Sequence, residues 1–120
     1  MLQMDILVHI AKTVKQELGT GFSEAVYHQA FLLHLRKNNI QYESERILPI
    51  TLHDHVIGSF RCDIIVENNI LIELKSIESK LRKSDINQVH NYLRFLPESI
   101  NHALLVNFGR DEVDFMVIDK

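Results

Sequence analysis

Apolar residues recur along the chain with two different periods. A spacing of three and four residues predicts helices with one buried face over residues 4–18, 24–38 and 84–96. Shorter runs that are rich in β-branched residues predict strands over residues 41–52, 56–66, 70–76, 103–108 and 112–118. The element order α-α-β-β-β-α-β-β is typical of an α/β (α+β) domain in which helices flank a central mixed sheet.

Local signals predict where the helices begin and end. Gly19 is expected to end the first helix in the left-handed conformation. Ser23 is expected to cap the second helix, with Phe22 and Tyr27 in contact across the cap as a hydrophobic staple. Pro97 ends the third helix, because proline restricts the residue before it.

Charged residues interrupt two strands that are otherwise apolar. Alternation puts Arg61 and Asp63 on one face of the strand 56–66, and Glu73 and Lys75 on one face of the strand 70–76. The opposite face of the first strand is expected to consist of Phe60, Cys62, Ile64 and Val66. Charges inside apolar strands are costly unless something binds them, so these positions call for an explanation.

The loop between these two strands decides whether the carboxylates of Asp63 and Glu73 meet. A two-residue turn would place them on opposite faces of the sheet. A three-residue loop, Glu67-Asn68-Asn69, would put Asp63 opposite Glu73 and Cys62 opposite Leu74, with every apolar pair on one face. We therefore predict the three-residue loop, with Asn69 in the left-handed conformation.

Two opposed carboxylates repel each other, and a divalent cation removes that repulsion. Oxygen ligands suit Mg²⁺ or Mn²⁺, and a metal beside Lys75 would be able to hydrolyse a phosphodiester. The structural alternative is a salt bridge between Lys75 and Asp63 or Glu73 on a solvated face. The apolar run Ile70-Leu71-Ile72 predicts a buried strand instead and favours the functional interpretation.

Size, charge and cysteine content limit the remaining possibilities. The 120 residues fit one domain, 1–120, without a separate binding domain. The net charge of −3 argues against a protein that coats nucleic acid electrostatically, although an acidic metal enzyme remains compatible with it. The single cysteine, Cys62, and the absence of a long apolar run favour a cytoplasmic protein without a membrane partner.

Three motifs carry a family resemblance over roughly residues 4–118. Asp63 followed by Glu73-Leu74-Lys75 resembles the signature of the PD-(D/E)XK nuclease superfamily. The segment 21–27 matches G-x-x-E-x-x-Y, which names a family of small bacterial and archaeal proteins in that superfamily. The segment 88–92 resembles the Q-x-x-x-Y motif of the RecB-like and lambda-exonuclease-like branches. Cys62 is a departure, because it stands where the superfamily name has proline.

The resemblance implies a restriction-endonuclease-like core and a metal-dependent nuclease that uses Mg²⁺ or Mn²⁺. DNA is the first expected partner and RNA the second. Asp63 and Glu73 would be metal ligands together with the backbone carbonyl of Leu74, and Lys75 would be the catalytic lysine. Glu24 would be the additional acid that ligates a metal directly or through water.

The resemblance also implies that Gln88 and Tyr92 line the site, where they would hold the substrate phosphate or order the lysine. Further phosphate contacts are expected from four basic residues that lie near the motif in the sequence: Arg61, Lys80, Arg82 and Lys83. Each assignment has a structural alternative. Glu24 at a helix start would also complement the helix dipole. Gln88 and Tyr92 would also serve as polar packing against the sheet. A run of basic residues such as Lys80, Arg82 and Lys83 is often only a solvated loop.

Three functional hypotheses stay open. The chain is a nuclease, a catalytically silent nucleic-acid-binding or protein-interaction module on a nuclease-like fold, or a subunit that acts only with a partner, as a homodimer or with another protein. The acids and the lysine of the motifs are intact, which favours the enzyme. The segment His53-Asp54-His55 is expected to be an exposed turn and not a zinc site.

Overall fold

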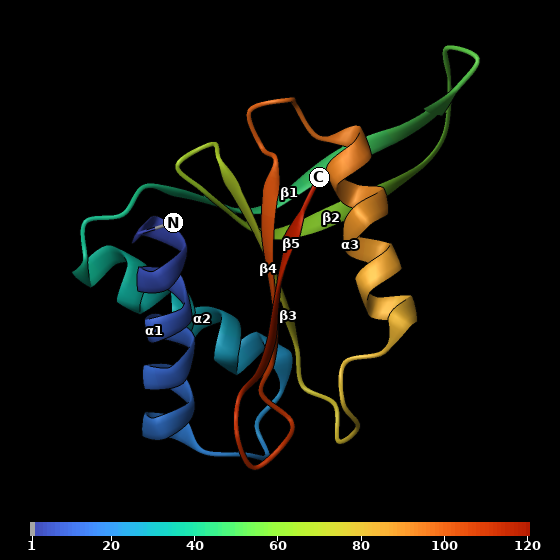
Figure 1. The fold of residues 1–120 in the computed structure, drawn as a ribbon. Coiled ribbons are helices and arrows are strands. Elements are labelled where there is room, and N and C mark those ends of the chain that lie inside the picture. The colour runs from blue at the N-terminus through green and yellow to red at the C-terminus, as the bar shows by residue number, and fades with distance from the viewer. Residues whose placement is uncertain (1) are drawn as a thin grey trace.

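Residues 2–120, which this computed structural model describes, form three helices and five strands in the predicted order (Figure 1). The elements are α1 (Leu2–Leu18), α2 (Glu24–Lys37), β1 (Tyr42–Leu52), β2 (His55–Val66), β3 (Ile70–Lys75), α3 (Lys83–Phe95), β4 (His102–Asn107) and β5 (Asp114–Asp119). Met1, which the predicted domain includes, lies outside the described residues. No helix within residues 2–120 has the length and apolar character needed to cross a membrane.

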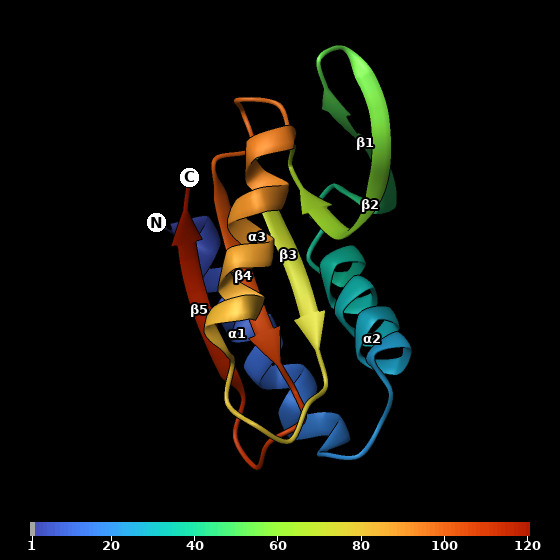
Figure 2. The ribbon, with the colours of Figure 1, turned by 90° about the vertical axis from the view of Figure 1, so that its right-hand side faces the viewer.

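The strands form one mixed sheet in the order β1-β2-β3-β4-β5. β3 and β4 are parallel, and every other neighbouring pair is antiparallel. The parallel pair requires a crossover connection, which α3 supplies. α1 and α2 lie on one side of the sheet and α3 on the other, as Figures 1 and 2 show. The predicted layered α+β architecture is therefore confirmed.

Apolar side chains cover both faces of the sheet. α1 and α2 pack over Ile64, Val66, Ile70, Ile72, Leu74, Leu104, Val106 and Phe108. α3 packs over Phe60, Cys62, Ile65, Leu71, Ala103, Leu105 and Ile118. Burying one aliphatic side chain stabilises a fold by about 1.5–3 kcal/mol, so β3 and β4, apolar on both faces, form the centre of the core.

The face predicted for β2 is wrong at one point. Cys62 packs with α3, whereas Ile64 packs with α1 and α2. The alternation therefore breaks at Asp63, and the backbone pairing with β3 ends before the predicted Cys62–Leu74 pair. The neighbouring strand is irregular at the same level, where Glu45 has a φ of 60°. Local irregularity of this kind adds twist to a strand and turns its side chains out of register.

The three-residue loop between β2 and β3 is confirmed, because Val66 pairs with Ile70. The prediction for Asn69 is wrong: the left-handed residues are Glu67, with a φ of 53°, and Asn68, with a φ of 52°. The backbone N–H of Asn69 donates to the carbonyl of Val66 at 2.9 Å, and its amide donates to Gln3 at 3.0 Å. These bonds, one of them to α1, hold Asn69 in another conformation.

The connection between α1 and α2 agrees with the sequence-based predictions with one exception. Gly19 has a φ of 73°, as predicted for the residue that ends a helix. Ser23 stands at the cap of α2, but its hydroxyl makes no capping hydrogen bond within the described residues. The rings of Phe22 and Tyr27 meet edge to face, with centroids 6.2 Å apart. Tyr27 also stacks on Phe108 at 4.5 Å, so core packing is its main contact.

β1 and β2 continue past the rest of the sheet as a projecting arm, residues 42–66, which is visible in Figures 1 and 2. Their pairing runs from Tyr42↔Val66 to Leu52↔His55, with a bulge beside Ile50. β3 pairs only with the last residues of β2. The rest of the arm packs toward α3, where Phe60 of β2 stacks on Tyr92 with ring centroids 4.2 Å apart.

Candidate active site

The backbone ladder between β2 and β3 stops where the two acids begin. Its last pair is Ile64↔Ile72. Beyond that pair, the backbone N–H of Asp63 donates to Oε2 of Glu73 at 2.8 Å, and the backbone N–H of Leu74 donates to Oδ2 of Asp63 at 2.8 Å. Each carboxylate thus accepts a main-chain hydrogen bond from the opposite strand. The two acids lie across from each other, and their side chains replace the ladder.

Burial disfavours the ionised forms of Asp63 and Glu73. Glu73 is 6% exposed. Its burial, and next the charge of Asp63, raise the pKa of Glu73 to about 8. Burial also raises the pKa of Asp63, against the hydrogen bond from Leu74 and the nearby positive charges. Two desolvated acids in contact favour a bound proton or a bound cation between them.

Lys75 ends β3 on the side of the sheet that α3 covers. Its Nζ donates to Oε1 of Gln88 at 3.3 Å and lies 3.9 Å from Oδ1 of Asp85. Within residues 2–120 the ion pair of Lys75 is made with Asp85, and not with Asp63 or Glu73. The salt bridge that would have explained the motif structurally is therefore not formed. The lysine side chain remains 23% exposed, so a substrate can reach it.

Asp85 is a residue of this site that the sequence reasoning missed. It is 4% exposed and lies in the first turn of α3. Its carboxylate accepts the backbone N–H of Arg82 at 2.8 Å and both guanidinium contacts of Arg82 at 3.2 Å. These hydrogen bonds lower the pKa of Asp85. An acid three residues after the start of a helix is a known capping signal, and its spacing from Gln88 puts both on the Lys75 side.

Glu24 opens α2 and approaches the site from another element. It is exposed, yet partial desolvation, and next the charge of Asp63, raise the pKa of its carboxyl, while Lys75 and Arg61 oppose that rise. Glu24 is thus within electrostatic range of all three. The hydroxyl of Ser76 donates to the carbonyl of Phe22 at 3.0 Å, which ties the end of β3 to the start of α2.

Gln88 and Tyr92 lie on one face of α3, as their spacing predicts. Gln88 contacts Lys75, as described above. The ring of Tyr92 stacks on Phe60 with centroids 4.2 Å apart and planes 10° from parallel. Burial, and next the charge of Glu73, raise the pKa of Tyr92. Both residues line a groove of about 420 Å³ between α3 and the arm.

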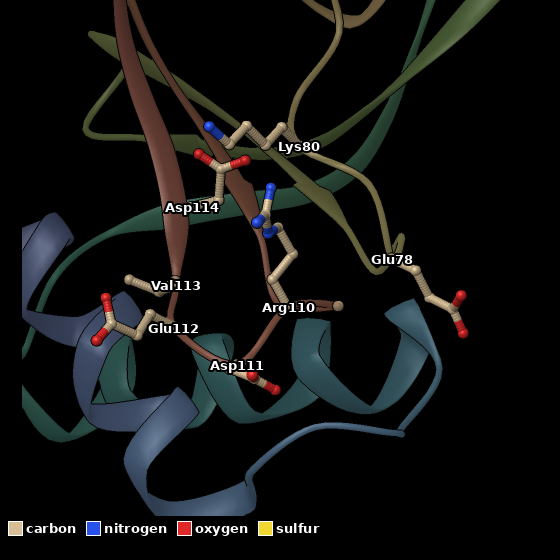
Figure 3. Close-up of a pocket in the computed structure, with 8 residues that line it drawn as sticks. Glu78, Lys80, Arg110, Asp111, Glu112, Val113 and Asp114 are labelled. Atoms are coloured by element: carbon tan, nitrogen blue, oxygen red, sulfur yellow. The ribbon is translucent and has the colours of Figure 1, made fainter.

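The basic residues expected at the site are dispersed. Arg61 is exposed, with Glu45 at 3.7 Å. Arg82 is engaged with Asp85. Lys83 is exposed at the first turn of α3. Lys80 points toward Asp114 at a different cavity of about 550 Å³ (Figure 3), so it does not share the surroundings of Lys75.

Two other candidates behave as expected of structural residues. Cys62 is fully buried, and burial raises the pKa of its thiol to about 12, which argues against a nucleophile. His53 and Asp54 form an exposed turn with φ values of 49° and 64°.

Within residues 2–120 no three His, Cys, Asp or Glu side chains are arranged so that they would hold a metal ion. The oxygen donors of Asp63 and Glu73 nevertheless suit a hard cation.

Comparisons with known proteins give a superfamily and a similar fold. The family described as the PD-(D/E)XK nuclease superfamily matches residues 3–117, at the level of the superfamily. Comparison with curated proteins gave no match. Among solved structures, the crystal structure of SSO0001 is similar over 80% of this chain, with a TM-score of 0.58 and 23% sequence identity. The similarity spans 49% of that chain, about half its length, and it supports the fold alone.

Proposed function

Because the chain belongs to the PD-(D/E)XK nuclease superfamily, we propose that it is a metal-dependent nuclease that hydrolyses phosphodiester bonds. DNA is the first substrate class to test, and RNA is the second. The observation that carries the proposal is the end of the β2–β3 hairpin, where Asp63 and Glu73 hold each other's strands through their carboxylates. Lys75 lies two residues after Glu73, at the end of β3.

The proposed cation is Mg²⁺ or Mn²⁺. Asp63 and Glu73 would hold it, with the carbonyl of Leu74 and the carboxylate of Glu24 as further oxygen ligands. When bound, such an ion polarises the phosphate and acidifies a coordinated water. Each of the two central carboxylates is fixed by a main-chain hydrogen bond to one of its oxygens, so the other oxygen is held in place for a ligand. Burial, and next the charge of Asp63, raise the pKa of Glu73, and a bound cation would stabilise the ionised form of this pair.

Lys75 supplies a fixed positive charge beside the two acids. Gln88 and Asp85 hold its ammonium from the α3 side, so the charge does not have to be ordered during the reaction. In this position the ammonium would orient the attacking water or stabilise the negative charge that develops on the phosphoryl oxygens. Preorganised charge of this kind is a large contribution to catalysis.

The test is a cleavage assay with linear, circular and single-stranded DNA and with RNA, each in Mg²⁺, Mn²⁺ or EDTA. Wild type is compared with Lys75→Met and with the matched control Lys37→Met, which changes an exposed lysine at the end of α2. We expect cutting that requires the metal, is lost in Lys75→Met and persists in Lys37→Met. Cutting that survives EDTA or Lys75→Met would contradict the proposal, as would no cutting on any substrate.

A catalytically silent nucleic-acid-binding module is the second candidate. One observation favours it: within residues 2–120 no group of three potential ligand side chains is arranged to hold a metal ion. This alternative predicts that nucleic acid binds without being cut, that Asp63→Asn leaves its affinity unchanged, and that a calorimetric titration with Mg²⁺ or Mn²⁺ gives no binding heat.

A further inference from the structure

The groove between α3 and the arm has an unusual lining. On the α3 side it is lined by Ser84, Asn87, Gln88, Asn91, Tyr92 and Phe95. Ile50 and Phe60 of the arm form the opposite wall. Its volume, about 420 Å³, is within the range of small-molecule sites.

The α3 residues of the groove form one continuous stripe. Their positions are separated by alternating steps of three and one residues, which places them on a single helical face. A stripe that faces another part of the fold is ordinarily apolar. Here the first four of the six residues carry a hydroxyl or an amide, and only Tyr92 and Phe95 are aromatic. Ser84, Asn87 and Asn91 are exposed, so their polar groups are open to a ligand at the rim of the groove, whereas Gln88, Tyr92 and Phe95 are half-buried.

The aromatic end of the groove is preformed, with Phe60 buried and Tyr92 and Phe95 half-buried. Phe60 stacks on Tyr92 with centroids 4.2 Å apart, and Phe95 lies 6.3 Å from Phe60 at a tilt of 59°. Stacked rings of this kind fix one another through burial and ring-to-ring contact. The surface therefore exists before any ligand arrives.

The exposed side of α3 is free of acidic residues. Its exposed positions are Lys83, Ser84, Asn87, His90, Asn91 and Arg94. The one acid in the helix, Asp85, is buried against Arg82. In a chain with 16 acidic and 13 basic residues, this helix presents a face that a polyanion can approach without repulsion.

The groove and the candidate active site share Gln88. Its side-chain oxygen accepts the Lys75 hydrogen bond at 3.3 Å, and the same residue lines the groove. A ligand group in the groove is therefore next to the residue that holds the proposed catalytic lysine.

We infer that the groove binds an unpaired nucleobase of the nucleic acid whose phosphate is cleaved at Asp63, Glu73 and Lys75; the inference rests on the proposed function. Asparagine and glutamine amides form paired hydrogen bonds with base edges. Aromatic side chains stack on bases that are not paired with another strand. The groove lining has no Lys or Arg, so its chemistry suits a base and not a phosphate. The substrate class is thus single-stranded or locally unpaired nucleic acid.

The experiment measures affinity separately from cleavage. Fluorescence anisotropy in EDTA gives the Kd for three DNA probes of one sequence: a perfect duplex, the same duplex with one unpaired nucleotide, and the single strand. A 2-aminopurine at the unpaired position reports its environment. The variants are Asn87→Leu and Asn91→Leu, which are exposed positions where leucine also favours a helix. Gln16→Leu is the matched control, an exposed amide on α1.

We expect wild type to bind both probes with unpaired nucleotides roughly tenfold more tightly than the duplex. Asn87→Leu or Asn91→Leu should lose that preference while their duplex affinity changes less than about twofold. Gln16→Leu should behave as wild type. Equal affinity for the three probes overturns the inference, and so does a preference that survives in both asparagine variants, or the absence of binding to any probe.

Cleavage of the same probes in Mg²⁺ separates this inference from the proposed function. Cutting without any preference for an unpaired nucleotide would support the nuclease activity and refute base binding in the groove. A binding preference that depends on Asn87 or Asn91, without cutting in any metal, would support base binding in the groove and refute the nuclease activity.

Discussion

The two halves of β3 have different ways of joining β2. Residues 70–72 are apolar and pair with β2 through the backbone, whereas at Glu73 and Leu74 the carboxylates of the hairpin take over the hydrogen bonds. Both halves keep their parallel pairing with β4. The first half is therefore built for stability. In the second half, hydrogen bonds to the carboxylates of Glu73 and of Asp63 on β2 replace part of the ladder, which suits the metal site proposed above.

The largest effect that distinguishes the two halves is on catalysis. Asp63→Asn should reduce cleavage at least roughly 100-fold, because it removes a charge that the reaction needs. The fold should survive, since the amide oxygen can still accept the Leu74 N–H. The measurement is the cleavage rate in Mg²⁺ beside Asp54→Asn, an exposed aspartate in the β1–β2 turn. Equal rates for the two variants would remove Asp63 from the proposed site.

A substitution in the apolar half of β3, residues 70–72, should lower the stability of the fold. Ile72 is fully buried, so Ile72→Ala should lower the free energy of unfolding by about 2–5 kcal/mol. Cleavage per folded molecule should stay near that of wild type. Urea unfolding followed by circular dichroism measures the first quantity, and the rate at a matched folded fraction measures the second. A rate loss as large as that of Asp63→Asn would mean that the halves are not separable.

The acids should also give the metal-free protein a distinctive pH dependence. The pKa of Glu73 is raised from 4.5 to about 8 in the folded state, so between these values the folded chain binds more protons than the unfolded chain. Stability should therefore fall as the pH rises from about 4.5 to 8. Melting temperatures in EDTA should show this fall, and Glu73→Gln should flatten it. Glu98→Gln, at a highly exposed position, should keep the wild-type slope; a wild-type slope in Glu73→Gln would contradict the account.

The smallest expected effect concerns Asp85, which we interpret as a positioning residue for Lys75. Asp85→Asn should lower kcat roughly tenfold and leave KM unchanged, because the contact at 3.9 Å orients the lysine and does not touch substrate. The asparagine oxygen can still accept the Arg82 N–H, but the loss of the charged contact with Arg82 should cost at most about 1 kcal/mol of stability. Partial recovery of kcat in Asp85→Glu would support positioning, whereas a change confined to stability would leave Asp85 a structural cap.

Much of the fold was predictable because the hydrophobic pattern fixed the register of the hairpin. The apolar residues Ile64, Val66, Ile70 and Ile72 left one loop length that buries them together, and the structure has that loop. The same reasoning failed for Cys62, because alternation assumes a regular strand and β2 is irregular at Asp63. It failed for Asn69, because a hydrogen bond to α1 is not visible in the local sequence.

The candidate site was predictable where its residues lie close in sequence and less so where it depends on packing. The opposition of Asp63 and Glu73 follows from the register. The contact of Lys75 with Asp85, and the stacking of Tyr92 on Phe60, depend on how α3 settles on the sheet. The basic run was expected to contact phosphate, but Lys80 lines the cavity beside Asp114 whereas Arg82 pairs with Asp85 at the start of α3.

The most direct test of the central claim is a calorimetric titration of Mn²⁺ into the metal-free protein, with wild type, Asp63→Asn and Asp54→Asn measured side by side. We expect binding heat in wild type and in Asp54→Asn, and its loss in Asp63→Asn. No heat in wild type, or the same heat in Asp63→Asn, would contradict the claim that this end of the β2–β3 hairpin is a metal centre.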